Sequence, residues 1–152
     1  MASLLKVDGI QTVAGKPIVN STGSVLQVLQ TVKTDTFSVN PSGSFVDITG
    51  MSVAITPLSS SSKILVQISI TGAGMTSVNT ASFRLVRDST VIYAGDAASS
   101  RSLGFAGAIS VDGSTTMSTC GTFIDSPSTT SATTYKIQVF SNGIVYINRT
   151  KN

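Results

Sequence analysis

The sequence contains no histidine, no tryptophan and no glutamate, and charged residues make up only 11% of its 152 positions. Ordinary soluble domains carry about 25% charged residues. Without histidine, a Ser–His–Asp or Cys–His catalytic arrangement is excluded, and acid–base catalysis would fall to aspartate, tyrosine, lysine or a lone cysteine. Zinc sites need histidine or several cysteines. The sequence therefore indicates a protein that is not an enzyme and holds no cofactor and no metal.

The chain has few cysteines, no long apolar run and no cluster of basic residues, and this disfavours several further classes of protein. Cys120 is the single cysteine, so no disulfide can form within the chain, and we expect a small buried apolar residue there. The apolar run at the N-terminus is too short for a signal peptide and is interrupted by Asp8, and no stretch is long enough to span a membrane. The net charge of +3 comes from scattered lysines and arginines, so nucleic-acid binding is not expected.

Serine and threonine are abundant, at roughly three residues in ten, which favours strands and turns over helices. A surface covered by hydroxyl groups rather than charges suits a protein that packs into an assembly, where a buried charge would be costly. The alternative is a threonine-rich, weakly charged monomer.

Residues 63–71, KILVQISIT, show the clearest pattern in the chain. Stiff β-branched residues alternate there with polar ones such as Gln67 and Ser69, which is the period-two pattern of a strand with one buried face. The residues on the apolar parity are Ile64, Val66, Ile68 and Ile70. We expect a central strand, with other strands pairing on both of its sides.

Other segments carry weaker strand patterns. Residues 24–34 match helical spacing as well as a strand, and their valine and threonine content favours the strand. Asn142-Gly143 between two alternating runs predicts a two-residue hairpin that sets Val139 opposite Tyr146. Gly50 is expected to end one strand, and residues 72–74 are expected to end the strand at 63–71. The other expected strands are 44–49, 51–55, 81–87, 91–94, 104–111, 114–125, 135–141 and 144–148. This count of about nine or ten short strands predicts an all-β fold, a single antiparallel β-sandwich, jelly-roll-like, over residues 24–152.

Residues 1–23 differ from the rest of the chain, because their apolar residues are isolated among glycines and Pro17. We expect an extended N-terminal arm, with one short strand at 4–7, that buries its apolar side chains against other subunits or another protein. The candidate attachment residues are Leu4, Leu5, Val7, Ile10, Val13, Ile18 and Val19.

The charged and aromatic residues allow a second candidate site. Arg84, Arg87 and Arg101 could form an anion or glycan site, or instead be solvated or pair with Asp88 and Asp96. The phenylalanines are expected in the core or at a subunit interface. The aspartates expected to serve turns are Asp88, Asp96, Asp112 and Asp125.

Four stretches of the sequence carry a resemblance to a known family. They are GKPIVNSTGSVLQVLQTVKTDTFS (15–38), SFRLVRDSTVIYAGD (82–96), FIDSPSTTSATTYKIQV (123–139) and VYINRT (145–150). Together they resemble the tail-fibre-like structural proteins of phages of aquatic bacteria, notably cyanophages, over nearly the whole chain. The resemblance implies a non-catalytic virion component on the exterior surface of the particle, and a homotrimer.

Three functions remain open at this point. The first is a trimeric short-fibre or tail-appendage protein that joins other virion proteins through its arm. The second is a trimeric capsid decoration, or cement, protein that stabilises the head. The third is a lectin-like module that binds host surface polysaccharide, which would require a concave patch lined by aromatic residues or aspartates.

Overall fold

The computed structural model describes residues 25–75, 79–97, 99, 103–110 and 115–151, and these contain nine strands and no helix. No helix in this part of the chain could therefore cross a membrane. The strands are β1 (Phe37–Val39), β2 (Phe45–Ile55), β3 (Ile64–Met75), β4 (Asn79–Arg87), β5 (Thr90–Tyr93), β6 (Ala106–Ser110), β7 (Met117–Asp125), β8 (Thr133–Ser141) and β9 (Val145–Ile147). The predicted all-β class is confirmed.

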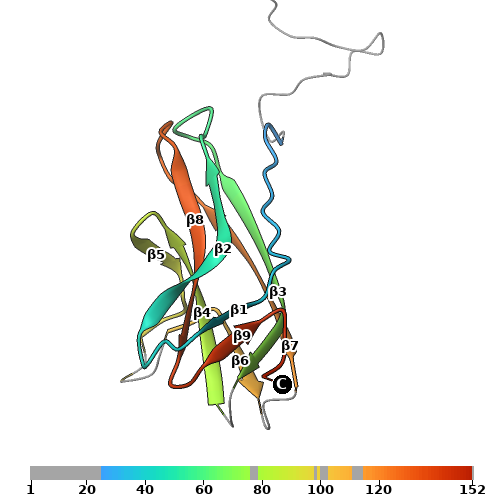
Figure 1. The fold of residues 1–152 in the computed structure, drawn as a ribbon. Coiled ribbons are helices and arrows are strands. Elements are labelled where there is room, and N and C mark those ends of the chain that lie inside the picture. The colour runs from blue at the N-terminus through green and yellow to red at the C-terminus, as the bar shows by residue number, and fades with distance from the viewer. Residues whose placement is uncertain (1–24, 76–78, 98, 100–102, 111–114, 152) are drawn as a thin grey trace, which may run out of the picture.

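The strands form two antiparallel sheets (Figure 1). One sheet has the order β1-β9-β3-β7, and the other has the order β2-β8-β4-β5, with β6 also pairing with β4. Strand β3 lies between β9 and β7 in the sheet order, but the predicted pairing on both sides of residues 63–71 is wrong, because only β7 pairs there and β9 pairs at Gly74 and Met75.

Both sheets contribute side chains to one hydrophobic cluster. Ile68 and Ile70 of β3 are 8% and 1% exposed, and Phe83 of β4 and Val139 of β8 are fully buried. Gln67, just before Ile68, and Ser69, between the two isoleucines, are exposed, which confirms the predicted alternation along β3. Burying each such apolar side chain stabilises the fold by about 1.5–3 kcal/mol, so β3 and its neighbours hold much of the core.

The predicted strand at residues 24–34 is wrong for its described part, since residues 25–34 belong to no strand. Figure 1 shows them as an extended trace along the outside of the molecule. Their apolar side chains fall on both parities, so no single face of a strand could be buried by turning the segment toward the core. The segment is extended, but it pairs with no strand of the described chain.

The predicted hairpin at Asn142-Gly143 is also wrong. The two residues do form a bend between β8 and β9, but these strands lie in different sheets. Val139 lies opposite Val46, and Tyr146 lies opposite Ser38. Turn chemistry specifies a change of direction, whereas the partner of each strand is chosen by burial of its apolar face.

Two predicted strand ends are internal to longer strands. Strand β2 passes through Gly50, which adopts a φ of 85°, and its register shifts between Asp47 and Ser52. Glycine adopts this positive φ without steric cost, so the strand can contain a β-bulge at Gly50 and continue beyond it. Strand β3 likewise continues through 72–74 to Met75 after a register shift.

Candidate functional site

The seven residues predicted to form the attachment site lie outside the described residues, as does the predicted strand at 4–7. They stay a prediction. The described chain begins at Val25, shortly after the predicted arm, and includes the residues that lead into the first strand. The predicted attachment residues are Leu4, Leu5, Val7, Ile10, Val13, Ile18 and Val19.

Residues 25–32, here called the connecting segment, expose an apolar surface. Ten large apolar residues are exposed in the described parts of the chain, and five of them lie in this segment, with exposed fractions from 46% to 81%. The segment has no charged residue. An exposed apolar surface of this kind marks a contact with another macromolecule more often than a free surface. The five residues are Val25, Leu26, Val28, Leu29 and Val32.

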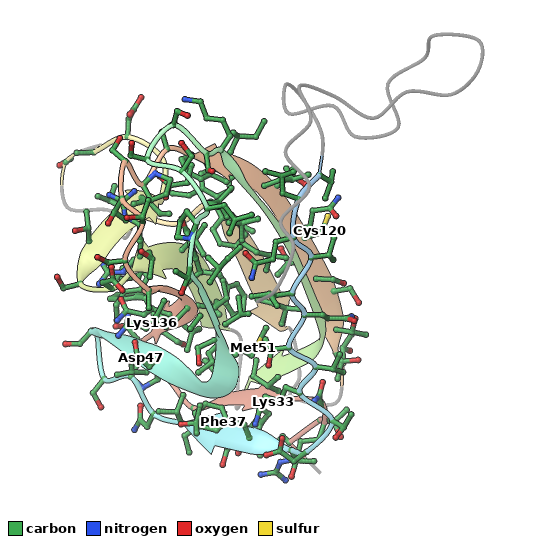
Figure 2. All side chains as sticks on the ribbon, turned by 90° about the horizontal axis from the view of Figure 1, so that it is seen from above. Lys33, Phe37, Asp47, Met51, Cys120 and Lys136 are labelled. Carbon is green, nitrogen blue, oxygen red and sulfur yellow. The ribbon has the colours of Figure 1, made fainter. Side chains whose placement is uncertain are left out.

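The connecting segment is fixed at its C-terminal end. The side chain of Lys33 is only 5% exposed, and its ammonium group lies 2.8 Å from the Asp35 carboxylate and 5.3 Å from the centre of the Phe37 ring (Figure 2). The side-chain amide of Asn148, just after β9, donates hydrogen bonds to the backbone carbonyls of Lys33 and Asp35 at 2.8 and 3.0 Å. The connecting segment therefore leaves the sheets from a defined point.

The face of β3 and β7 that points away from the core is a second surface with exposed apolar side chains, and at its edge the Lys63 ammonium group donates to the Ser126 hydroxyl at 2.6 Å. In the register of the two strands, Leu65 lies opposite Ile124, Gln67 opposite Thr122 and Ser69 opposite Cys120. All six residues are exposed, with Leu65 at 57% and Ile124 at 64%. We call these six residues the outer face of β3 and β7.

Cys120 therefore lies on the surface, and its predicted burial is wrong. Its position on the outward parity of β7 follows from Gly121 and Phe123, which turn toward the interior. Figure 2 places Cys120 on the opposite side of the molecule from Asp47 and Lys136.

The described chain does not bring the arginines together as an anion or glycan site, the first of the two interpretations given for them. Arg84 lies on the outer face of the five-stranded sheet, where its guanidinium carbon is 3.9 Å from the centre of the Phe45 ring and its Nε donates to Gln138 at 2.7 Å. Burial lowers the pKa of Arg84, and the charge of Asp47 acts in the opposite direction. Arg87 points elsewhere, and Arg101 lies outside the described residues.

Asp47 is the acidic member of this outer surface. It accepts hydrogen bonds from Lys136 at 2.8 Å and Gln138 at 2.7 Å, and these bonds, that from Lys136 above all, lower its pKa. The polar groups around Arg84 thus satisfy one another.

Arg87 pairs with Asp125 rather than with Asp88. Its Nη1 lies 2.8 Å from one carboxylate oxygen of Asp125, and the Tyr135 hydroxyl donates to the same oxygen at 2.6 Å. Asp125 belongs to β7 in one sheet, and the other two residues belong to β4 and β8 in the other. The three side chains therefore form a polar link between the sheets, in which Asp125 and Tyr135 are buried and Arg87 is partly exposed.

The acid–base properties of this link are those of a structural contact. Burial raises the pKa of Tyr135, and the hydrogen bond to the Asp125 carboxylate raises it further. The phenol therefore stays protonated and donates a hydrogen bond to Asp125. Burial acts to raise the pKa of Asp125, but the hydrogen bonds from Tyr135 and Arg87 outweigh it and lower that pKa. Both groups stay locked in one protonation state near neutral pH.

The role of Asp125 was missed because it was assigned to a turn, yet the sequence held a signal for it. Asp125 follows Gly121 and Phe123 on the parity of β7 that faces the interior of the protein. An aspartate on an inward parity needs a buried partner, and Arg87 and Tyr135 were available. Asp88, by contrast, does serve a turn, with a φ of 53° and a hydrogen bond from the Thr134 backbone amide.

Within the part of the chain that the structure describes, no three histidine, cysteine, aspartate or glutamate residues cluster as metal ligands would. The surfaces with the strongest functional character are instead the connecting segment and the outer face of β3 and β7, which can bury apolar area against another macromolecule. No protein-family model matches the chain, and no curated protein or solved structure matches it either.

Proposed function

We propose that this chain is a non-enzymatic structural protein of a phage virion, a trimeric surface component of the short-fibre or tail-appendage type. Residues 24–152 would form a jelly-roll-like β-sandwich that faces outward. Residues 1–23 would form the arm that attaches this domain to other virion proteins. The proposal has its origin in the sequence resemblance over residues 15–38, 82–96, 123–139 and 145–150.

The observation that carries the proposal is the connecting segment. A short uncharged stretch with five exposed apolar side chains joins the arm to the sheets. Left in water, this area would disfavour a lone chain, whereas burying it in an assembly contributes about 25 cal/mol per Å². The contribution of both sheets to one core supports the sandwich.

The two alternatives differ in what they need from the structure. A decoration protein would also bury the connecting segment on assembly, and the small size of the chain fits a decoration protein equally well. A lectin-like module would need an open aromatic face for stacking on a sugar. The best-placed ring, Phe45 on the five-stranded sheet, already has Arg84 on one face and the Phe140 ring 5.4 Å away. Of the two, the decoration protein is favoured.

Deleting residues 1–23 should separate folding from attachment. A protein that starts at Ser24 is expected to fold and to form trimers, with an unchanged far-ultraviolet circular dichroism spectrum, because the strands of both sheets follow the deletion. It should fail to enter particles when it is the sole copy available during assembly.

The control is a variant that keeps the full arm and carries Thr90→Ser at the exposed first residue of β5, which should be incorporated like the parent. Normal incorporation of the truncated protein would show that the arm is not the anchor. An electron-microscopy map of the particle would then distinguish head from tail.

A further inference from the structure

The bend at Asn142-Gly143 connects β8 of the five-stranded sheet to β9 of the four-stranded sheet. Asn142 is exposed there, whereas Ser141 before it and Val145 after the bend are fully buried. Asn142 is also the only asparagine of the sequence that precedes a glycine, since the others precede serine, proline, threonine or arginine or stand last. The bend therefore places an exposed side-chain amide next to a backbone nitrogen that no side chain of its own residue shields.

An asparagine followed by glycine can react without an enzyme. The backbone nitrogen of Gly143, after losing its proton to water or hydroxide, attacks the side-chain amide carbon of Asn142, and a five-membered succinimide ring forms as ammonia leaves. Water then opens the ring at either carbonyl carbon, which gives aspartate or isoaspartate. Glycine favours the ring closure, because it has no side chain to hinder the attack and its backbone is the least restricted. Water is the sole co-reactant.

The fold holds the attacking nitrogen in a hydrogen bond. The Gly143 N–H donates to the Ser141 hydroxyl oxygen at 3.1 Å, and Ser141 is fully buried. The Ser141 backbone carbonyl accepts a hydrogen bond from the Gly43 amide at 3.0 Å, so Ser141 is itself fixed by the turn that precedes β2. The Gly143 N–H must leave Ser141 before it can lose its proton to water, and this leaves a buried hydroxyl oxygen without its donor. The hydrogen bond to Ser141 therefore slows the reaction.

We propose that Asn142 is a site of spontaneous deamidation and that the Ser141 hydroxyl sets its rate in the folded protein. This modification site is independent of the proposed virion function. The product carries a new negative charge beside Gly43, where a Cβ would lie 3.5 Å from the Asn142 amide oxygen. In the isoaspartate product the backbone also gains a carbon atom between β8 and β9. Val145 and Ile147 are buried directly after the bend, so the longer connection disturbs the packed core and lowers the thermal stability of the protein.

Peptide mass spectrometry that separates aspartate from isoaspartate measures the conversion during long incubation at mildly alkaline pH. The folded wild-type protein should convert at Asn142 before any other asparagine, and more slowly than the same chain unfolded in urea. Folded Ser141→Ala should convert about two- to tenfold faster than folded wild type, a factor that corresponds to the net energy of one hydrogen bond. The aged wild-type protein should unfold at a lower temperature than the fresh protein, whereas aged Asn142→Gln should not.

The matched control is Ser44→Ala, which removes an exposed hydroxyl from the neighbouring turn and keeps the hydrogen bond of Gly143, so it should convert at the wild-type rate. Equal rates for folded Ser141→Ala and wild type, or equal acceleration by Ser44→Ala, would show that the Ser141 hydroxyl does not set the rate. If Ser141→Ala does not fold, wild type alone decides, because equal conversion in the folded and urea-unfolded states contradicts any restraint by the fold. An Asn142 that stays intact in both states would overturn the site itself.

Discussion

Replacing Ile68 with aspartate should leave no folded protein. Ile68 is 8% exposed in the middle of β3 and packs in the cluster to which both sheets contribute. The substitution places a carboxylate there, with Ile70 and Val66 as its neighbours on the same face of the strand. A buried carboxylate without a partner costs several kcal/mol, which is comparable to the whole stability of many domains. Circular dichroism and solubility after expression measure the result.

Gln67→Asp is the matched control, because it puts the same side chain one residue away on the exposed parity. The Gln67→Asp chain should still fold, because Gln67 points away from the core, and circular dichroism and solubility measure this. Because Gln67 belongs to the outer face of β3 and β7, the control concerns the fold of the chain and not its contacts with other macromolecules. Loss of the folded chain in both variants would show that the assignment of the two faces of β3 is wrong.

Asp125→Ala should give the second largest loss of stability. The substitution leaves the Arg87 guanidinium, whose side chain is 24% exposed, and the buried Tyr135 hydroxyl without their shared acceptor. Removing one partner of a buried ion pair costs about 3–5 kcal/mol, and the partial exposure of Arg87 places the expected loss near the lower value. Urea denaturation followed by fluorescence or circular dichroism measures it.

Asp47→Ala breaks an ion pair of the same length, between Asp47 and Lys136, whose carboxylate side chain is half exposed. Its expected cost is below about 1 kcal/mol. If Asp125→Ala cost no more than Asp47→Ala, the polar link between the sheets would contribute nothing to stability.

The pH dependence of the Asp125 contribution has a definite sign. The pKa of Asp125 is lower in the folded protein than its ordinary value, so its contribution is complete above that ordinary value and is lost as the pH falls through the folded pKa. The difference in unfolding free energy between wild type and Asp125→Ala should therefore be constant near neutral pH and shrink below about pH 4.

The sequence predicted the fold class well and the strand partners poorly. The alternation in β3 correctly assigned Ile68 and Ile70 to the core, because burial on one face imposes a period of two. The turn at Asn142-Gly143 was recognised, but the partners of β8 and β9 were not. A turn dipeptide reports a local conformation, whereas strand pairing depends on contacts between residues distant in sequence.

The surfaces proposed to make contacts were predictable only in part. The apolar character of residues 24–34 was visible in the sequence, but it was interpreted as a paired strand. Apolar residues on both parities also fit a segment that pairs with no strand of its own chain, as the structure has it, and the pattern by itself does not distinguish the two. The exposure of Cys120 depends on the parity of β7, which its inward-facing neighbours define.

The claim that most depends on measurement is that this chain is one subunit of a trimer. Light scattering coupled to size-exclusion chromatography, at micromolar concentration and neutral pH, measures the mass of the folded protein directly. The account predicts a species of about three times the 15.6 kDa chain mass. A well-folded species with the mass of a single chain, whose far-ultraviolet spectrum shows the β-structure described above, would contradict it.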